Sequence, residues 1–309
     1  MSERPVIIVA QPHLAFLIPA LNQHYEALPL WEESGKRRLA EASALVAAGE
    51  YRLAPELIDA MPRLGLIACF TVGYDGIDVA WAHARGIAVS HANHANDDDV
   101  ADHAIGLIIA HRRRIVDGDR MLRSDGWTSQ AKTVTRSLGG QIIGIVGLGC
   151  IGIAVARRAE ALRMQVRWWG PRPKPDAAWP CAESLVALAG ASDVLLVAAR
   201  AHHGNEKLIS TDIIDALGPD GLLVNVARGQ LIDEEALIAA LRDGRLGGAA
   251  LDVFAAEPAP AARWAGVPNT VLTPHTAGST DMAIARMTEM LFANLAAFFA
   301  GEPLPTPAH

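Results

Sequence analysis

The chain has 309 residues, of which 51% are hydrophobic and 20% are charged, and its formal net charge is −7. This composition excludes a disordered chain, and the acidic balance argues against a nucleic-acid-binding protein, which is normally basic. At about 150 residues per domain, the length predicts two domains.

Short apolar, β-branched runs alternate with helical patterns along the chain, and this alternation predicts an α/β fold with parallel sheets. In the first part of the chain the expected strands lie at 6–10, 44–47, 66–68 and 87–89. A long helical pattern comes next over 100–123, after an acidic run whose charges suit the start of a helix.

The pattern is clearest from about residue 139 onward. The expected strands lie at 141–146, 166–169, 194–198, 222–226, 249–253 and 270–273, with helices that include 151–163 and 233–242. Six strands connected in this way suit a doubly wound, Rossmann-type dinucleotide-binding sheet. A last long helix is expected over 280–300.

The two long helices lie at the boundaries of the central region and could cross between domains. We therefore expect a discontinuous division, in which residues 1–98 and 281–309 form one domain and residues 99–280 form the other. The three cysteines, Cys69, Cys150 and Cys181, have no C-x-x-C spacing. They exclude a disulfide scaffold and favour a reducing compartment, so a cytoplasmic location is expected.

A glycine-rich segment lies directly after the expected strand 141–146. Gly147, Gly149 and Gly152 form the pattern G-x-G-x-x-G at the start of the expected helix. The first glycine permits a tight turn, the second lets the backbone approach a pyrophosphate, and the third lets the helix pack on the strand. In this strand–turn–helix context the pattern predicts a dinucleotide site, although glycine-rich turns can be purely structural.

The end of the next strand bears on which dinucleotide is bound. An acidic residue about 20 positions after the glycine pattern would hold a ribose hydroxyl, but the strand ends in Trp169 and Gly170. Arg172 comes next, and an arginine there can pair with a ribose 2′-phosphate. We therefore expect NADP in preference to NAD; the alternative is that Arg172 is a solvated loop charge.

Three ionisable residues lie after three successive strands, where open α/β sheets bind their ligands. Arg228 could bind a substrate carboxylate and polarise the adjacent carbonyl. His275 could donate a proton to the carbonyl oxygen, and Glu257 could orient the imidazole and raise its pKa. Each residue alone has a structural alternative, but the three together predict carbonyl reduction.

With these residues the chain resembles the D-isomer-specific 2-hydroxyacid dehydrogenases over nearly its whole length. The resemblance rests on the segments 72–78 and 98–104, the glycine pattern, N-V-A-R-G at 225–229, D-V-F-x-x-E-P at 252–258 and Pro-His at 274–275. Within the family the chain looks most like the glyoxylate/hydroxypyruvate reductases, because Gly170 replaces an acidic residue and the opening segment ends in Leu-Trp-Glu at 30–32.

The resemblance implies reduction of a small 2-oxo acid, glyoxylate or hydroxypyruvate, to the D-2-hydroxy acid. The hydride would come from the nicotinamide and the proton from His275, with Arg228 and Glu257 completing the catalytic set. Backbone amides at Val72 and Gly73 would help Arg228 to hold the substrate carboxylate. The expected cofactor-binding residues are Gly147, Gly149, Cys150, Ile151, Gly152, Trp169, Gly170, Arg172, Ala227 and Asp252, the last facing the nicotinamide carboxamide.

The resemblance also implies a smaller, flavodoxin-like substrate-binding domain that closes on the dinucleotide-binding domain, and a homodimer. We expect no metal, no nucleic-acid partner and no membrane span, since no apolar run reaches about 18 residues. Two alternatives stay open. The chain could be a dinucleotide-sensing regulatory protein on the same fold, or another 2-hydroxyacid dehydrogenase with a bulkier substrate.

Overall fold

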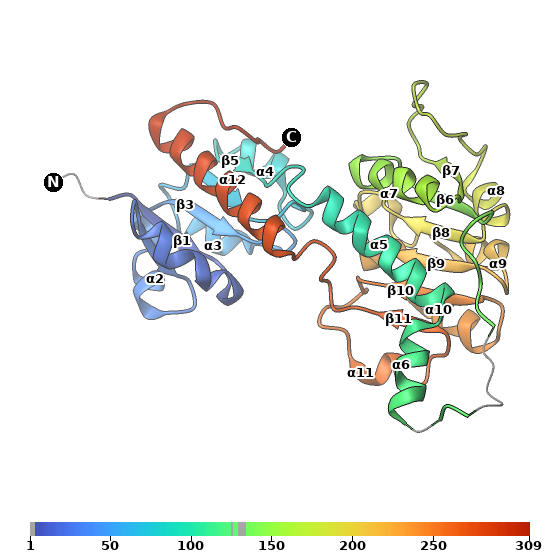
Figure 1. Ribbon diagram of the computed structural model, residues 1–309. Helices are drawn as coiled ribbons and strands as arrows, with labels where there is room; N and C mark the ends of the chain where they lie inside the picture. The colour runs from blue at the N-terminus through green and yellow to red at the C-terminus, as the bar shows by residue number, and fades with distance from the viewer. Residues whose placement is uncertain (1–3, 125, 129–133) are drawn as a thin grey trace. The chain divides into compact units, whose positions relative to one another are not determined.

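The computed structural model describes residues 4–124, 126–128 and 134–309, which fold into two compact units (Figure 1). The first unit combines Met1–Ala95 with Asp281–His309, and the second is Asn96–Thr280. Each unit contains its own parallel sheet. The assignment of these units to substrate and dinucleotide binding stays a prediction.

The first unit is built on a five-stranded parallel sheet with the order β2-β1-β3-β4-β5. This is the flavodoxin-like order, and it confirms the predicted fold of the smaller domain. The strands are β1 (Val6–Val9), β2 (Glu26–Pro29), β3 (Ala42–Ala47), β4 (Leu66–Cys69) and β5 (Ala88–Ser90). The sequence analysis missed β2, an edge strand that contains a glutamate and ends in a proline, both unusual in central strands.

Helices cover both faces of this sheet, so its central strands are buried on both sides. Ile7 and Val46 face a core that includes α12, whereas Ile8 and Leu45 face a second core that includes α3 and α4. The helical elements are η1 (Pro12–Leu17), α1 (Ile18–Leu21), α2 (Glu33–Arg37), η2 (Leu39–Glu41), α3 (Pro55–Asp59), α4 (Val79–His83) and α12 (Asp281–Ala300).

The long helix α12 is apolar enough to span a membrane by length and composition alone. Met287, Leu291 and Leu295, however, recur every four residues and are buried in the core of the first unit. This spacing places one helix face against the protein core. We therefore interpret α12 as a core helix that carries the chain back into the first unit.

The second unit contains a six-stranded parallel sheet with the order β11-β10-β9-β8-β6-β7. Its strands are β6 (Ile142–Val146), β7 (Gln165–Trp169), β8 (Val194–Val197), β9 (Leu222–Asn225), β10 (Gly248–Leu251) and β11 (Thr270–Leu272). Trp168 forms one further parallel bridge with Cys181, beyond the β7 edge. With this bridge as a reduced third strand, the order is that of a Rossmann sheet, 3-2-1-4-5-6, extended by one strand.

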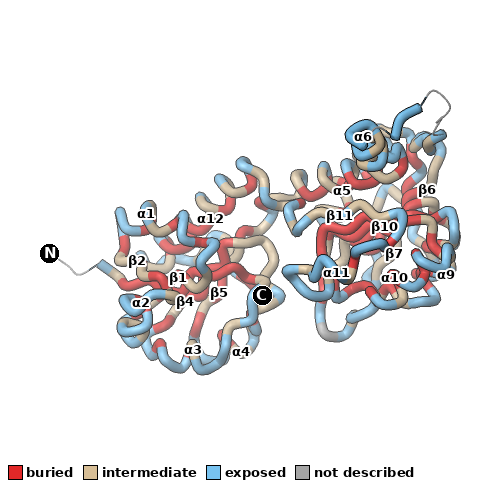
Figure 2. The backbone as a smooth tube through the Cα atoms, turned by 90° about the horizontal axis from the view of Figure 1, so that it is seen from below, coloured by how far each residue is buried: buried red, intermediate tan, exposed pale blue. Residues whose placement is uncertain are grey.

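This sheet is sandwiched between two helical layers, and Figure 2 shows its strands β6, β8, β9 and β10 as mainly buried segments. Ile145 and Val224 face a core shared with α5 and α7, whereas Leu195 and Leu223 face a core shared with α8, α9 and α10. The helical elements are α5 (Asp97–Arg112), α6 (Ile115–Arg123), α7 (Cys150–Ala161), α8 (Leu185–Gly190), η3 (His203–Asn205), α9 (Thr211–Leu217), η4 (Gly229–Leu231), α10 (Glu234–Arg242) and α11 (Ala261–Trp264).

The single helix expected over 100–123 is wrong, because the structure has two helices there. α5 ends at Arg112, and α6 begins at Ile115. Between them Arg114 has a φ of 52°, in the left-handed region that interrupts a right-handed helix. Arginine is a good helix former, so the sequence carries no local signal for this break.

Candidate active site

The strands of the second sheet end in register along one edge. Val146 pairs with Val197, Val197 with Asn225, Asn225 with Leu251, and Leu251 with Leu272. The residues directly after these strands therefore lie along the same edge. Open α/β sheets bind ligands at this edge, at the point where the strand order reverses, which is here between β6 and β8.

The glycine loop after β6 has two positions that only glycine fits. Gly147 has a φ of +93°, and a Cβ atom there would lie 2.7 Å from Cα of Ala199. A Cβ atom on Gly152 would lie 2.3 Å from the carbonyl oxygen of Gly147. Both positions therefore need glycine, one for the turn and the other for the approach of α7 to the loop.

Gly149 differs from the other two glycines. A Cβ atom on Gly149 would meet no described atom within 4 Å, so open space lies beside the first turn of α7. The amide groups at the start of α7 and the helix dipole favour a negative group in that space. The loop fits the pyrophosphate of a dinucleotide, with Gly149 leaving room for its close approach.

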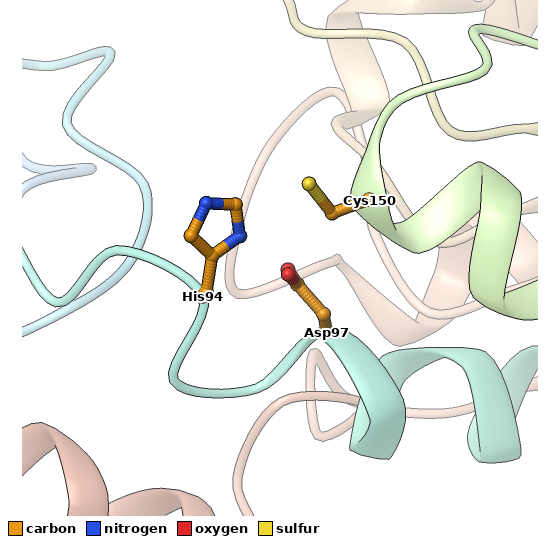
Figure 3. A group of neighbouring side chains, drawn as sticks. All are labelled: His94, Asp97 and Cys150. Atoms are coloured by element: carbon orange, nitrogen blue, oxygen red, sulfur yellow. The ribbon is translucent and has the colours of Figure 1, made fainter. Parts of the chain in front are cut away.

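Cys150 and Ile151 form the first turn of α7, beside the glycine loop. Figure 3 draws Cys150 together with Asp97, which begins α5 in the same unit. Burial raises the pKa of the Cys150 thiol, and the carboxylate of Asp97 raises this pKa further. The thiol therefore stays uncharged near neutral pH, so it does not oppose a phosphate group at the helix start.

The end of β7 presents no carboxylate. Trp169 is half-buried and packs against the core, and Gly170 is the next residue. Arg172 lies in the exposed segment that comes after it. The two residues at the end of β7 therefore include no acid that would repel a ribose phosphate.

His275 and Glu257 form a close pair at the carboxyl edge of the sheet. Nδ1 of His275 lies 2.6 Å from Oε2 of Glu257, and the amide of Phe254 donates to Oε1 of Glu257 at 2.9 Å. The His275 and Glu257 side chains are 35% and 34% exposed. Because a carboxylate only accepts hydrogen bonds, Nδ1 is the donor, and Nε2 is the ring atom left for a substrate.

The same pair has opposed pKa shifts. The hydrogen bond that His275 donates to Glu257 raises the pKa of His275, against burial and the positive charge of Arg228, which lower it. Burial raises the pKa of Glu257, but the hydrogen bonds of His275 and Phe254 and the charges of His275 and Arg228 outweigh burial and lower it. The pair thus favours an imidazolium beside a carboxylate, which is a proton donor held ready near neutral pH.

Arg228 lies in the turn after β9, and a buried asparagine fixes that turn. The side chain of Asn225 accepts a hydrogen bond from the amide of Ala227 at 3.0 Å and donates one to the carbonyl of Arg228 at 2.9 Å. A Cβ atom on Gly229 would lie 1.9 Å from the carbonyl carbon of Phe254. The turn that carries Arg228 therefore lies against the segment that holds Glu257.

Asp252 is the first residue after β10, and its side chain is 1% exposed. Oδ1 accepts hydrogen bonds from the hydroxyl of Thr273 at 2.5 Å and the amide of Thr276 at 2.9 Å, and Oδ2 accepts one from the amide of Ala277 at 2.9 Å. Burial raises the pKa of Asp252, but hydrogen bonds from His103, Thr273 and the two amides outweigh it and lower the pKa. Asp252 therefore holds, as an anion, the loop that carries His275.

The predicted carboxylate-binding residues Val72 and Gly73 lie in the first unit, in the loop after β4. His91 Nδ1 lies 3.0 Å from the carbonyl oxygen of Val72, and the hydroxyl of Thr71 lies 3.0 Å from the carbonyl oxygen of Gly73. The carbonyl groups of this loop are thus held by side chains of the same unit. The role of the two amides stays a prediction.

The sequence analysis missed three residues whose hydrogen bonds hold the turns and loops of this site in place. Thr273 is the first residue after β11, and its position at a strand end could have drawn attention to it. Asn225 is fully buried at the end of β9, where a polar residue in an apolar run is a usable signal. His103 lies on α5, and nothing in the sequence indicates which strand end its side chain meets.

Comparison with known proteins identifies the family of this chain. The family model for the NAD-binding domain of D-isomer specific 2-hydroxyacid dehydrogenases matches residues 105–277. A hydroxyphenylpyruvate reductase from Plectranthus scutellarioides is 36% identical over 306 residues, which cover 97% of this chain and 98% of the relative. A glyoxylate/hydroxypyruvate reductase A from Arabidopsis thaliana matches with the same identity and coverage.

A solved structure extends the comparison to the fold. The NADPH-dependent glyoxylate/hydroxypyruvate reductase from Sinorhizobium meliloti, in complex with NADP and malonate, has a TM-score of 0.89 and 33% identity. The match covers 99% of this chain and 97% of that one. The chain belongs to the D-isomer specific 2-hydroxyacid dehydrogenases, which confirms the predicted resemblance. Membership of this family implies a nicotinamide cofactor, and the glycine loop described above fits one.

Proposed function

We propose that this protein reduces a small 2-oxo acid to the corresponding D-2-hydroxy acid, with glyoxylate or hydroxypyruvate as the substrate. The observation that carries the proposal is the Glu257–His275 pair, 2.6 Å apart, beside Arg228 at the ligand-binding edge of a dinucleotide-binding sheet. A protonated imidazole and a guanidinium are the groups that reduction of a carbonyl next to a carboxylate requires.

In the proposed reaction Arg228 binds the substrate carboxylate and draws electron density toward the carbonyl oxygen. The glycine loop and the start of α7 would hold the dinucleotide, and its reduced nicotinamide would supply the hydride for the carbonyl carbon. His275 transfers the proton on Nε2 to the carbonyl oxygen, which becomes the hydroxyl group. Glu257 keeps the ring oriented through Nδ1 and favours its charged form, and the exposed part of the ring lets solvent return the proton.

We propose separately that the protein binds NADP in preference to NAD. Its support is the strand end at Trp169 and Gly170, which lacks an acidic residue, and the exposed Arg172 nearby. The Sinorhizobium meliloti relative is described as NADPH-dependent, which is consistent with this preference. An arginine can pair with the ribose 2′-phosphate, whereas a carboxylate would repel it.

A bulkier substrate is the second candidate, because one 36% identical relative is named a hydroxyphenylpyruvate reductase. The test is the initial rate of reduced-nicotinamide oxidation with glyoxylate, hydroxypyruvate, pyruvate and a phenyl-substituted 2-oxo acid, each with NADPH and NADH. We expect the highest kcat/KM for the two small acids with NADPH. A preference for the phenyl acid would favour the second candidate, and cofactor binding without turnover would favour a dinucleotide sensor.

We also propose that the second unit binds the dinucleotide, the first binds the substrate, and the protein is a cytoplasmic homodimer. The dimer proposal is supported by exposed apolar side chains in and after α6. Ile115 is 53% exposed, Leu122 61% and Trp127 68%. Exposed apolar residues in one region are typical of association surfaces. Light scattering after size-exclusion chromatography tests this, with a dimer mass expected and a monomer mass contradicting it.

A further inference from the structure

The loop that carries His275 is fixed to the end of β10 by several hydrogen bonds. The amides of Thr276 and Ala277 donate to the carboxylate of Asp252, and the amide of His275 donates to the carbonyl oxygen of Asp252 at 2.8 Å. His275 itself has a φ of 53°, a conformation that is costly for a residue with a side chain. The position of the imidazole therefore depends on Asp252 staying in place.

His103, in the second turn of α5, contacts this arrangement from the helix side. Its Nε2 lies 2.9 Å from the hydroxyl of Thr273 and 3.4 Å from Oδ1 of Asp252. The hydroxyl has one proton, and the Asp252 carboxylate, 2.5 Å away, can only accept it. The Thr273 oxygen is then an acceptor toward His103, so Nε2 of His103 must carry a hydrogen.

We infer that His103 is a positioning residue for the proposed reduction: its Nε2–H holds Thr273 and Asp252 together, and through them the loop that carries His275. The inference rests on the proposed function, since it assigns His103 to the proton-donating site. His103 is not proposed to contact the substrate or the cofactor. Its effect passes from α5 to Thr273 and Asp252, and from Asp252 to the amides of the loop.

Loss of this donor has a direct physical consequence for the loop. Without the Nε2–H group, the Thr273 oxygen and Asp252 lose a hydrogen-bond donor in a largely buried place, which is unfavourable. The Asp252 carboxylate can then shift, and the two loop amides lose their fixed acceptor. A small displacement of a reacting group lowers rates strongly, by about 100-fold for 1 Å.

The test compares two substitutions at one position. His103→Leu removes the donor at similar volume, whereas His103→Gln places an amide N–H near the position of Nε2. His111→Leu is the matched control, because it removes a histidine two turns further along α5 whose Nε2 meets the carbonyl of Asn269 instead. Deuterium exchange of the amides at 273–277 and the steady-state kcat and KM are measured for each protein.

In the His103→Leu variant we expect the amide hydrogens of Thr276 and Ala277 to exchange at least about tenfold faster than in the wild type. We also expect kcat to fall about 10- to 100-fold. His103→Gln should recover most of both properties, and His111→Leu should leave exchange at 273–277 unchanged. The inference is overturned if His103→Leu keeps both exchange and kcat within twofold of the wild type. The inference would also be overturned if the Leu and Gln variants lost kcat equally and amide exchange rose throughout the second unit.

The exchange readout separates this inference from the proposed function. If the unsubstituted protein reduces no 2-oxo acid, the proposed function fails. Faster exchange confined to 273–277 in His103→Leu, with recovery in His103→Gln, would still support the link from His103 to the loop. Unchanged exchange in an active protein would refute the link and leave the proposed function intact.

Discussion

Nδ1 of His275 lies 2.6 Å from Oε2 of Glu257, and this contact joins the segment after β11 to the segment after β10. The two strands are neighbours in the sheet, so the segments that carry the two residues leave the sheet side by side. The contact fixes the ring through one nitrogen and raises the His275 pKa. One pair of side chains thus sets both the orientation and the charge of the proposed proton donor.

The first prediction concerns pH. Reduction uses protonated His275, so the rate falls as pH rises through the raised pKa of His275. Glu257→Gln removes the main cause of that raised pKa, so the fall in kcat/KM moves to lower pH and kcat drops about 10- to 100-fold. Glu160→Gln, at an exposed position on α7, is the control. A pH profile unchanged in Glu257→Gln would refute this role of the carboxylate.

The second prediction concerns the substrate carboxylate. Arg228→Lys keeps the positive charge but removes the planar fork that binds a carboxylate through two hydrogen bonds. The KM for the 2-oxo acid should rise about 10- to 100-fold, while the dissociation constant of the cofactor changes little. Arg167→Lys, at an exposed position on β7, should have no effect. Equal loss of cofactor and substrate affinity would indicate instead that Arg228 supports the fold.

The third prediction separates two glycines of the loop. Gly149→Ala has room for its methyl group, so the melting temperature should stay the same while the dinucleotide binds about tenfold more weakly or worse. Gly152→Ala forces a methyl group against the carbonyl oxygen of Gly147. Such overpacking costs about 1–3 kcal/mol, so its melting temperature should fall clearly. Normal dinucleotide binding by Gly149→Ala would contradict a pyrophosphate at this loop.

The fourth prediction tests the choice of cofactor. Arg172→Ala should raise the KM for NADPH about tenfold and leave the KM for NADH unchanged, because only NADPH has the 2′-phosphate. Arg167→Ala, on the strand that leads to Arg172, is the matched control. If Arg172→Ala changes neither KM, Arg172 is a solvated loop charge and NADP recognition has another source.

Much of the fold could be predicted from the sequence because buried parallel strands leave a strong pattern. Apolar runs such as Val194–Val197 and Leu222–Asn225 are central strands buried on both faces, as the sequence indicates. β2 (Glu26–Pro29) was missed because an edge strand needs only one buried face. The break at Arg114 was missed because arginine favours helices, so no local preference marks its left-handed conformation.

Some features of the site follow from the order of the strands along the chain, and others depend on how the helices pack on the sheet. Arg228, Glu257 and His275 could be singled out because parallel strands bring their carboxyl ends to one edge. The register also explains why Asp252 and Thr273, which come directly after paired strand ends, form a hydrogen bond. His103 could not be predicted, because the orientation of a helix over a sheet is set by packing in three dimensions.

The most direct test of the central claim is the rate of NADPH oxidation with glyoxylate by His275→Ala, measured together with its affinity for NADPH. We expect the rate to fall about 100- to 10,000-fold, the usual range for loss of a general acid, with the NADPH dissociation constant within about twofold of the wild type. A variant that retains more than about a tenth of the wild-type rate would contradict the assignment of His275 as the proton donor.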